Sequence, residues 1–124
     1  MEQEARRASK NAYVRYSHFP VGAAVLTGEG RIFAGCNVEN ASYGLTICAE
    51  RSAVFQAIAQ GASTIRAVLV YTPTAQPTAP CGACRQVINE FGPNAEVICA
   101  CDGKNRIRRK LSELLVEPFG PHNL

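Results

Sequence analysis

Apolar and polar positions follow different periods in successive stretches of the N-terminal half. Residues 2–14 place small apolar side chains at about helical spacing, which predicts an amphipathic helix over this range. Residues 21–27 and 31–37 are two apolar runs on either side of the short turn GEG. Two such runs around a glycine-containing turn predict an antiparallel β-hairpin.

The stretch after the hairpin predicts a loop and then a helix. Residues 38–46 show no regular apolar period and are rich in turn-forming residues, so we expect a loop. From Cys48 onward, alanines recur at four-residue steps beginning with Ala49, and Gly61 ends the pattern. Small side chains on one face predict a deeply packed helix that stops at this glycine.

The second half alternates between strand and helix patterns. The run AVLVYT is continuously apolar, as expected of a strand buried on both faces, and PTAQPTAP after it predicts a loop. A final short helix follows a weaker strand pattern. The expected elements are a strand at 67–72, a helix at 82–91, a strand at 95–101, a strand near Arg106 and a helix at 111–116.

This order of elements defines the fold class. Each strand–helix–strand crossover requires parallel strands, which we expect to be neighbours, and each lays a helix against the sheet. The first two strands pair antiparallel, so the sheet is mixed. We therefore predict the α/β class, as a three-layer α/β/α sandwich with about five strands, in a single domain over residues 1–124.

Composition and charge exclude several classes of protein. The chain of 124 residues is 47% hydrophobic, which suits one globular domain and excludes disorder. Apolar runs are too short for a transmembrane helix, and the charged N-terminus lacks a signal sequence, so a cytoplasmic protein is expected. The formal charge of +3 is diffuse except at residues 106–110, which we interpret as an exposed turn or strand edge, not a nucleic-acid surface.

Six cysteines are many for a chain of this length, and in a cytoplasmic protein they indicate metal binding or catalysis. Cys81 and Cys84 form a C-x-x-C motif at a predicted helix start, and Cys48 opens the other predicted crossover helix. Both helices should begin at the same edge of the sheet. Three thiolates would then surround one Zn²⁺ ion per chain and leave its fourth position open, as in catalytic zinc sites.

Two residues beside Cys48 supply further chemistry. Glu50 lies two residues from a ligand, near the metal but on a different side of the helix, so it is a candidate general base that does not bind the ion. Arg51 lies three residues from Cys48 and is either a donor to the ligand sulfur or a surface arginine. C-x-x-C alone also fits a structural zinc site or a redox dithiol, but C-x-E followed by P-C-x-x-C is a specific pattern of zinc deaminases.

With these motifs the chain resembles a known family, the small homotetrameric cytidine deaminases. The matching segments are YSHFPVGAA, GCNVENASYGLTICAER, PCGACRQV and the FGP near the end. They extend from Tyr16 to Pro121. The resemblance implies hydrolytic deamination of cytidine and 2′-deoxycytidine to uridine and 2′-deoxyuridine with release of ammonia, in pyrimidine salvage.

The resemblance also implies a role for individual residues. Zinc would bind Cys48, Cys81 and Cys84, with Glu50 as the proton shuttle. The residues implied at the substrate are Phe19 against the pyrimidine, Asn37 and Glu39 at the ribose hydroxyls, and the backbone near Ala49 and Cys81 at the polar edge of the base. Ala41, Tyr43 and Phe119 would reach the site of a neighbouring subunit in a homotetramer, although LLVEPFGP departs from the commoner LLP before the aromatic residue.

The residues themselves leave plainer alternatives open. By position alone, Phe19 also fits a core aromatic, and Asn37 and Glu39 also fit loop-capping residues. Glu39 would repel a phosphate, which favours a nucleoside over a nucleotide. The plainer expectation for the remaining cysteines is burial as small hydrophobic residues, and for the histidines a place in a loop or tail. These residues are Cys36, Cys99, Cys101, His18 and His122.

Three other functions remain as alternatives to deamination of cytidine. One is deamination of a modified pyrimidine nucleoside, which the segment NVEN disfavours. Another is editing of a polynucleotide, which the short chain and scattered charge disfavour. The last is a non-enzymatic zinc or redox module, which Glu50 and the open metal position disfavour.

Overall fold

The computed structural model describes all 124 residues as five strands, four α-helices and two short 3₁₀ helices. In chain order the elements are α1 (Glu2–Ser9), β1 (Gly22–Thr27), β2 (Ile32–Cys36), η1 (Tyr43–Leu45), α2 (Ala49–Ala59), β3 (Ile65–Tyr71), α3 (Gly82–Phe91), β4 (Glu96–Ala100), β5 (Ile107–Lys110), α4 (Leu111–Leu114) and η2 (Pro121–Asn123). The predicted hairpin, the helix at 82–91 and the short fifth strand are confirmed.

The strands form one mixed sheet in the order β2-β1-β3-β4-β5. β1 pairs antiparallel with both β2 and β3, β3 pairs parallel with β4, and β5 closes the sheet antiparallel to β4. The prediction of parallel neighbours is correct for the crossover through α3 but wrong for the crossover through α2. β2 and β3 run parallel, but they are not neighbours, because β1 lies between them. The tight hairpin turn keeps β1 paired with β2, and the other edge of β1 pairs with β3.

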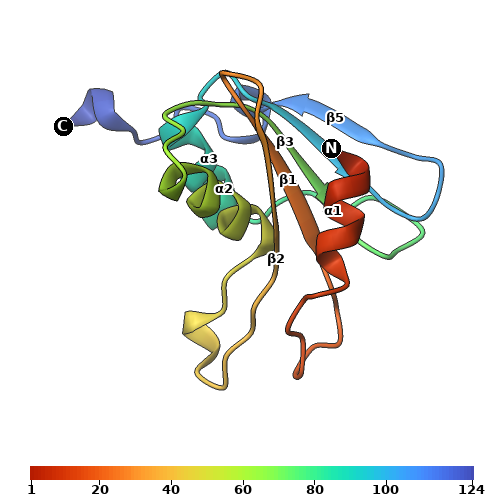
Figure 1. The fold of residues 1–124 in the computed structure, drawn as a ribbon. Helices are drawn as coiled ribbons and strands as arrows, with labels where there is room; N and C mark the ends of the chain where they lie inside the picture. Colours follow the sequence, from red (N-terminus) through yellow and green to blue (C-terminus); the bar gives the residue numbers. More distant parts are fainter.

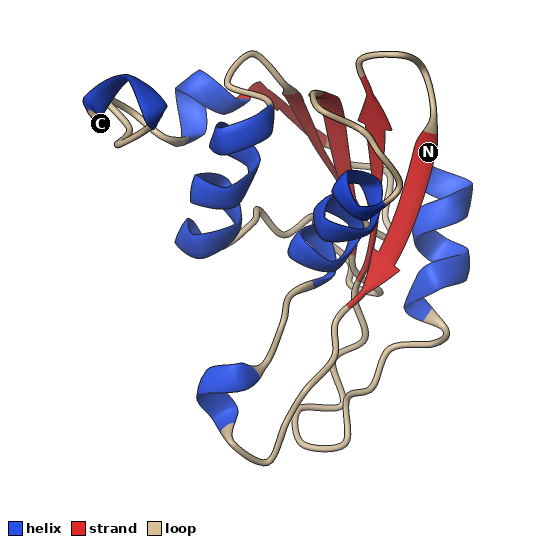
Figure 2. Ribbon diagram, turned by 60° about the vertical axis from the view of Figure 1, so that its left-hand side comes forward, coloured by secondary structure: helices blue, strands red, loops and turns tan.

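Helices cover both faces of the sheet, as predicted (Figures 1 and 2). α1 packs on one face, against β1, β2 and β3, and α2 and α3 lie together on the other face. The larger core fills the space between the sheet and the two long helices, and includes Val25, Val54, Val68 and Ile88. A smaller core lies beneath α1. The molecule is therefore a three-layer sandwich, and the larger of its two cores lies between the sheet and the α2–α3 layer.

Glycine at position 35 sets how closely α2 approaches the sheet. A Cβ atom added at Gly35 of β2 would lie 2.5 Å from the backbone nitrogen of Ala53 in α2. Ala49, Ala53 and Ala57 are fully buried on the face of this helix, as the alanine spacing predicts. Small residues on both sides thus place the helix backbone almost directly on the strand, and this contact fixes the start of α2 relative to the sheet.

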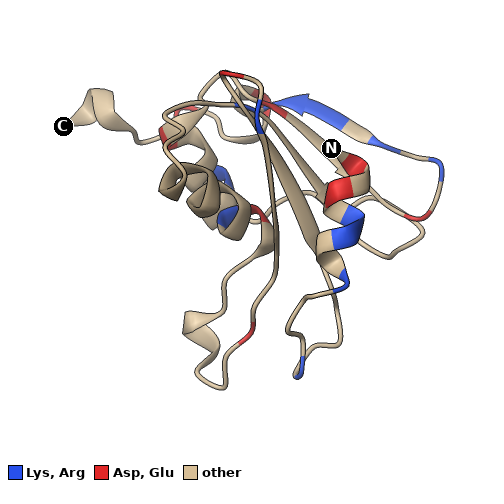
Figure 3. Cartoon of the chain, viewed as in Figure 1, with Lys and Arg blue, Asp and Glu red and all other residues tan.

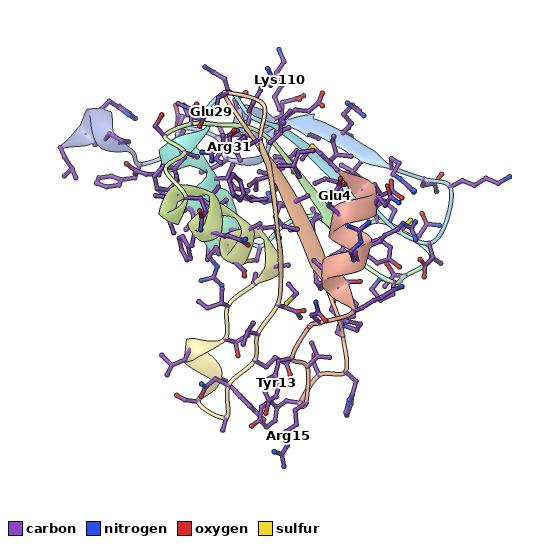
Figure 4. The ribbon with its side chains drawn as sticks, viewed as in Figure 1. Glu4, Tyr13, Arg15, Glu29, Arg31 and Lys110 are labelled. Atoms are coloured by element: carbon purple, nitrogen blue, oxygen red, sulfur yellow. The ribbon has the colours of Figure 1, made fainter.

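The first helix is shorter than predicted and ends at Ser9. The following segment leaves the helix because Tyr13 pairs with Val38, through hydrogen bonds from its amide to Asn37 O at 3.0 Å and from Glu39 N to its carbonyl at 2.9 Å. Val38 in turn pairs with Ile47. Tertiary backbone pairing thus replaces local helix propensity. Figure 4 shows Tyr13 and Arg15 at the end of the molecule opposite to Glu29, Arg31 and Lys110.

Most of the basic segment at 106–110 forms the edge strand β5 (Figure 3). The arginines of the segment are exposed, as predicted. Arg106 pairs with Glu2 at 3.0 Å and Arg108 with Glu96 at 2.7 Å. Charged side chains on an edge strand oppose pairing with another chain. The longest helix, α2, has 11 residues, and no helix has the length and apolarity needed to cross a membrane.

Candidate functional site

Two helix starts bring the three motif cysteines together. Cys48 is the N-cap of α2 and Cys81 is the N-cap of α3, while Cys84 lies in the first turn of α3. Both helices follow a strand and begin on the same side of the sheet, where the partial positive charge of a helix N-terminus favours thiolates. The three Sγ atoms lie within 4.8 Å of one another. The structure thus assembles the cluster that the spacing predicts.

The geometry and chemistry of this cluster fit zinc. The Sγ atoms of Cys48 and Cys81 are 3.9 Å apart. Two sulfurs on a tetrahedral zinc at ~2.3 Å would be separated by about 3.8 Å. The hydrogen bond from the Cys84 thiol and, to a smaller extent, that from Arg51 lower the pKa of Cys48 to about 5, although burial of Cys48 acts in the opposite direction. The hydrogen bond between the two cysteines raises the pKa of Cys84. Nη2 of Arg51 donates to Cys48 Sγ at 3.4 Å, so of the two alternatives for this residue the structure shows the donor to the ligand sulfur.

Glu50 is the one buried carboxylate of the chain. Its side chain lies in the first turn of α2 and is only 4% exposed. Burial is the main reason that its pKa rises to about 7, with the negative charge of Cys48 adding to the effect. Glu50 does not belong to the three-cysteine cluster, although it lies two residues along the chain. A buried carboxyl beside a metal site, but outside its ligand set, is suited to proton transfer.

A cavity of about 240 Å³ opens beside the cluster. It is lined by six residues that the sequence analysis singled out, namely Phe19, Asn37, Cys48, Ala49, Glu50 and Cys81. The remaining lining residues are Val21, Thr46, Val70, Thr72, Thr78 and Ala79. The walls are mostly apolar, with few polar groups at defined places, which is typical of a small-molecule site. Phe19 is 39% exposed, so it is a wall of this cavity and not a core aromatic.

Asn37 and Glu39 hold the turn that carries Phe19. The side chain of Asn37 accepts from Val21 N at 2.8 Å and donates to Phe19 O at 2.9 Å. The carboxylate of Glu39 accepts from Ser17 and from Tyr16 N, and the Ser17 hydroxyl is the main cause that lowers the pKa of Glu39. Both residues therefore cap a loop, which is the alternative to substrate binding that the sequence left open for them. Asn37 also lines the cavity, whereas Glu39 lines an adjoining hollow with Tyr16, Ser17, Tyr43 and Thr46.

The three residues assigned to a neighbouring subunit's site do not line this chain's own cavity. Ala41 and Tyr43 lie in the 38–46 segment, and the side chain of Tyr43 is 74% exposed. Phe119 is also exposed and lines a separate hollow on the C-terminal segment, where its carbonyl accepts from Nε2 of Gln86 in α3. None of the three lines the cavity beside Glu50, although Tyr43 lines the adjoining hollow together with Glu39.

The sequence analysis missed several polar residues at the site. Thr72 follows β3 directly, and its hydroxyl is within 2.7 Å of that of Thr74 and 3.5 Å of that of Thr78. The rule that ligands bind at the carboxyl ends of strands could have indicated Thr72. Ser17 lies inside the matched segment YSHFPVGAA, but nothing in its spacing distinguishes it from an ordinary turn serine. Cys99 and Cys101 are buried, and His18 and His122 lie outside the regular strands and α-helices, as expected, whereas Cys36 is only half-buried.

Comparison with known proteins identifies the class to which this fold and site belong. Residues 1–101 match the family described as "Cytidine and deoxycytidylate deaminase zinc-binding region". The chain belongs to this family. The family is defined by its zinc-binding region and the three sulfurs are placed to hold such an ion, so one zinc ion is the cofactor.

Individual relatives are similar over much or nearly all of the chain. The cytidine deaminase of Sporosarcina psychrophila is 52% identical over 88 residues, which cover 71% of this chain and 65% of that protein. That of Mycobacterium tuberculosis is 43% identical over 120 residues, or 97% of this chain and 87% of the relative. The crystal structure of cytidine deaminase from Burkholderia pseudomallei superposes with a TM-score of 0.90, at 46% identity over 94% of each chain.

Proposed function

We propose that this protein is a zinc-dependent cytidine deaminase that converts cytidine and 2′-deoxycytidine to uridine and 2′-deoxyuridine with release of ammonia. The observation that carries the proposal is the buried carboxyl of Glu50 beside the three-cysteine cluster, at one end of an apolar cavity. The names of the relatives agree with this activity. We further propose that the reaction serves pyrimidine salvage in the cytoplasm, where six free cysteines would stay reduced.

In this proposal Cys48, Cys81 and Cys84 hold the zinc ion, and Arg51 stabilises the thiolate of Cys48 through its hydrogen bond. When bound, zinc acidifies water and so supplies a nucleophile at neutral pH. Three thiolates leave one coordination position for this chemistry. The arginine offsets part of the negative charge that three sulfur ligands bring, which keeps the metal electrophilic.

Glu50 moves the protons of the reaction. Its carboxylate takes a proton from the attacking water and delivers it to the ring nitrogen next to C4, which makes C4 electrophilic. The hydroxide that remains of the water forms a bond to C4. Glu50 then takes the proton of this new C4 hydroxyl and passes it to the amino group, so that the C4–N bond breaks and ammonia leaves. Burial of this side chain excludes bulk water from the transfer path, so the proton passes between Glu50 and the substrate.

The cavity orients the nucleoside for this transfer. Phe19 packs against the pyrimidine ring, and backbone groups of Ala49 and Cys81, which both line the cavity, contact the polar edge of the base. Asn37 and Glu39 bind the ribose hydroxyls with the hydrogen-bonding capacity that the neighbouring turn leaves free. The carboxylate of Glu39 also disfavours a phosphate at this end, which selects a nucleoside over a nucleotide.

We propose that the active assembly is a homotetramer whose sites are shared. Ala41, Tyr43 and Phe119 are exposed in the single chain, and each would complete the site of a neighbouring copy. Large apolar side chains that remain exposed in one chain are the kind that a subunit interface buries. The chain as a whole, residues 1–124, forms one domain of this assembly.

The decisive experiment follows the ultraviolet absorbance of cytidine and 2′-deoxycytidine with purified protein, before and after removal of zinc by a chelator. Both nucleosides should be deaminated, and activity should disappear with the metal and return when zinc is restored. A panel of modified cytidines tests the alternative that such a nucleoside is the true substrate. No turnover of any cytidine by the zinc-loaded protein would refute the proposal.

A further inference from the structure

Ser17 joins the two segments that form the sugar end of the site. It lies in the turn between α1 and β1, opposite the extension of β2 that carries Glu39. The hydroxyl of Ser17 donates to Oε2 of Glu39, while the backbone amides of Ser17 and Tyr16 donate to Oε1 at 3.1 Å and 2.9 Å. Three donors from one short turn thus fix a single half-buried carboxylate.

The direction of the Ser17 hydroxyl is itself fixed by the chain. Its oxygen accepts from the amide of Phe19 at 3.1 Å, so the hydroxyl proton is free to point toward Glu39. His18 lies between these residues with φ of 56°, a left-handed conformation that is rare for residues other than glycine. The side chain of Asn37, which accepts from Val21 N and donates to Phe19 O, holds the other side of the turn. Such strain persists where neighbouring contacts over-determine the backbone.

The pattern of donors determines what Glu39 has left for a ligand. Each carboxylate oxygen accepts about two well-directed hydrogen bonds. Oε1 already receives two amides, and Oε2 receives only the Ser17 hydroxyl. One lone-pair direction on Oε2 therefore remains, and its orientation depends on Ser17, which sets the rotation of the carboxylate group.

We propose that Ser17 is a positioning residue for substrate binding, which orients the carboxylate of Glu39 so that Oε2 receives a sugar hydroxyl of the nucleoside. This inference rests on the proposed function, because it takes Glu39 as a ribose contact. Ser17 does not line the cavity beside Glu50, and its hydroxyl donates to Glu39. Its loss should therefore weaken binding of the sugar and leave the chemical step intact.

The test compares Ser17→Ala with the wild-type enzyme on ligands with and without sugar hydroxyls. A charge-assisted hydrogen bond is lost, so kcat/KM for cytidine should fall about 10-fold, almost entirely through KM. Inhibition by uridine should weaken by a similar factor. Inhibition by 2′,3′-dideoxyuridine, which lacks both hydroxyls, should change less than about 2-fold because it makes no bond to Glu39.

Three variants separate positioning from a general structural effect. Ser17→Thr keeps the hydroxyl and should restore most of the affinity, whereas Ser112→Ala removes an exposed serine of α4 and should change nothing. In a Glu39→Gln background, Ser17→Ala should add little further loss. Equal weakening of uridine and dideoxyuridine, or a full additional loss in that background, would overturn the role of Ser17. A wild-type protein inactive on cytidine would instead overturn the proposed function and, with it, this inference.

Discussion

Glu50 combines two properties that no other carboxylate of the chain shares, since it is almost fully buried and lies within two residues of a metal-binding cysteine. An ionisable side chain is rarely buried without a partner unless its chemistry is used. Glu50 forms no ion pair, and its surroundings are the cysteine cluster and the cavity. Proton transfer is the function that we propose for this arrangement.

We expect Glu50→Gln to lower kcat by at least ~100-fold, because positioned proton transfer contributes roughly this factor or more. The amide has the same shape but no transferable proton at neutral pH, so zinc content and melting temperature should stay close to those of the wild type. Steady-state kinetics with cytidine and metal analysis of the same sample provide the measurement. Glu90→Gln, in an exposed position near the end of α3, is the matched control. Near-normal turnover of the Glu50 variant would remove this residue from the mechanism.

A separate prediction concerns the effect of Arg51 on zinc affinity. Removal of its guanidinium takes away the donor to Cys48 Sγ, and loss of such a supporting contact typically weakens metal binding by about 10- to 100-fold. Arg51→Ala should therefore release zinc to a competing chelator at lower chelator concentration than the wild type. Arg66→Ala, which removes an exposed arginine of β3, is the control. Equal zinc affinity in the two variants would mean that the arginine serves only packing.

Sequence alone identified the cysteines and Glu50 because each lies at a helix start, where spacing translates directly into a shared direction. It left the turn around Ser17 undescribed for a physical reason. That turn is held by hydrogen bonds between residues 16–17 and 39, and a left-handed residue at 18 shapes it. Neither feature has a periodic pattern, so only the structure shows how this turn, which we propose to hold the ribose-binding carboxylate, is built.

At the scale of elements, the placement of α2 depends on the contact between Gly35 and the backbone of Ala53. We expect Gly35→Ala to destabilise the protein by about 1–3 kcal/mol, the usual range for overpacking, because the added methyl group would press on the helix backbone. Denaturant unfolding should show this as a lower midpoint. Since α2 carries Cys48 and Glu50, zinc affinity and kcat should fall with it.

The control for this prediction is Gly44→Ala in η1. An added Cβ there has no atom within 4 Å, so the unfolding midpoint should remain within error of the wild type. If Gly35→Ala is equally harmless, the sheet and helix are free to separate slightly and the contact does not fix the site. Comparison of the two variants distinguishes close packing from the general effect of replacing a glycine.

Most elements could be predicted, but their arrangement could be predicted only in part. The helix at 82–91 was located correctly because a proline precedes it and Gly92 follows it. The insertion of β1 between β2 and β3 could not be deduced, since both parallel and antiparallel neighbours satisfy the same apolar runs. The helix predicted over 2–14 stops early because pairing of Tyr13 with Val38 is a long-range contact.

At the scale of the whole molecule, exposed apolar side chains indicate that the chain assembles into an oligomer. Tyr43, Leu45, Val116 and Phe119 are each more than half exposed in the single chain. Light scattering should give the mass of a tetramer, and the melting temperature should rise with protein concentration, as for any oligomer that dissociates on unfolding. A monomer at micromolar concentration would contradict the shared site.

Sharing of sites between copies can be tested by mixing two inactive variants. Glu50→Gln lacks the proton shuttle, and Phe119→Ala lacks the aromatic that we assign to a neighbour. Co-expressed chains should recover part of the wild-type activity, because some sites would pair an intact Glu50 with an intact Phe119 from the other copy. The two proteins mixed without exchange of subunits serve as the control. No gain over this control would place Phe119 outside the neighbouring site.

The metal cluster has a consequence beyond chemistry, because its cysteines begin the two helices that form one entire layer of the sandwich. A metal ion bound there would cross-link α2 and α3 as a disulfide would, and its binding free energy would add to the free energy of unfolding. Chains made without the ion unfold more often and are exposed to proteolysis. The amount of this protein in a cell would then follow the supply of zinc, so that scarcity of the metal removes the polypeptide together with its activity.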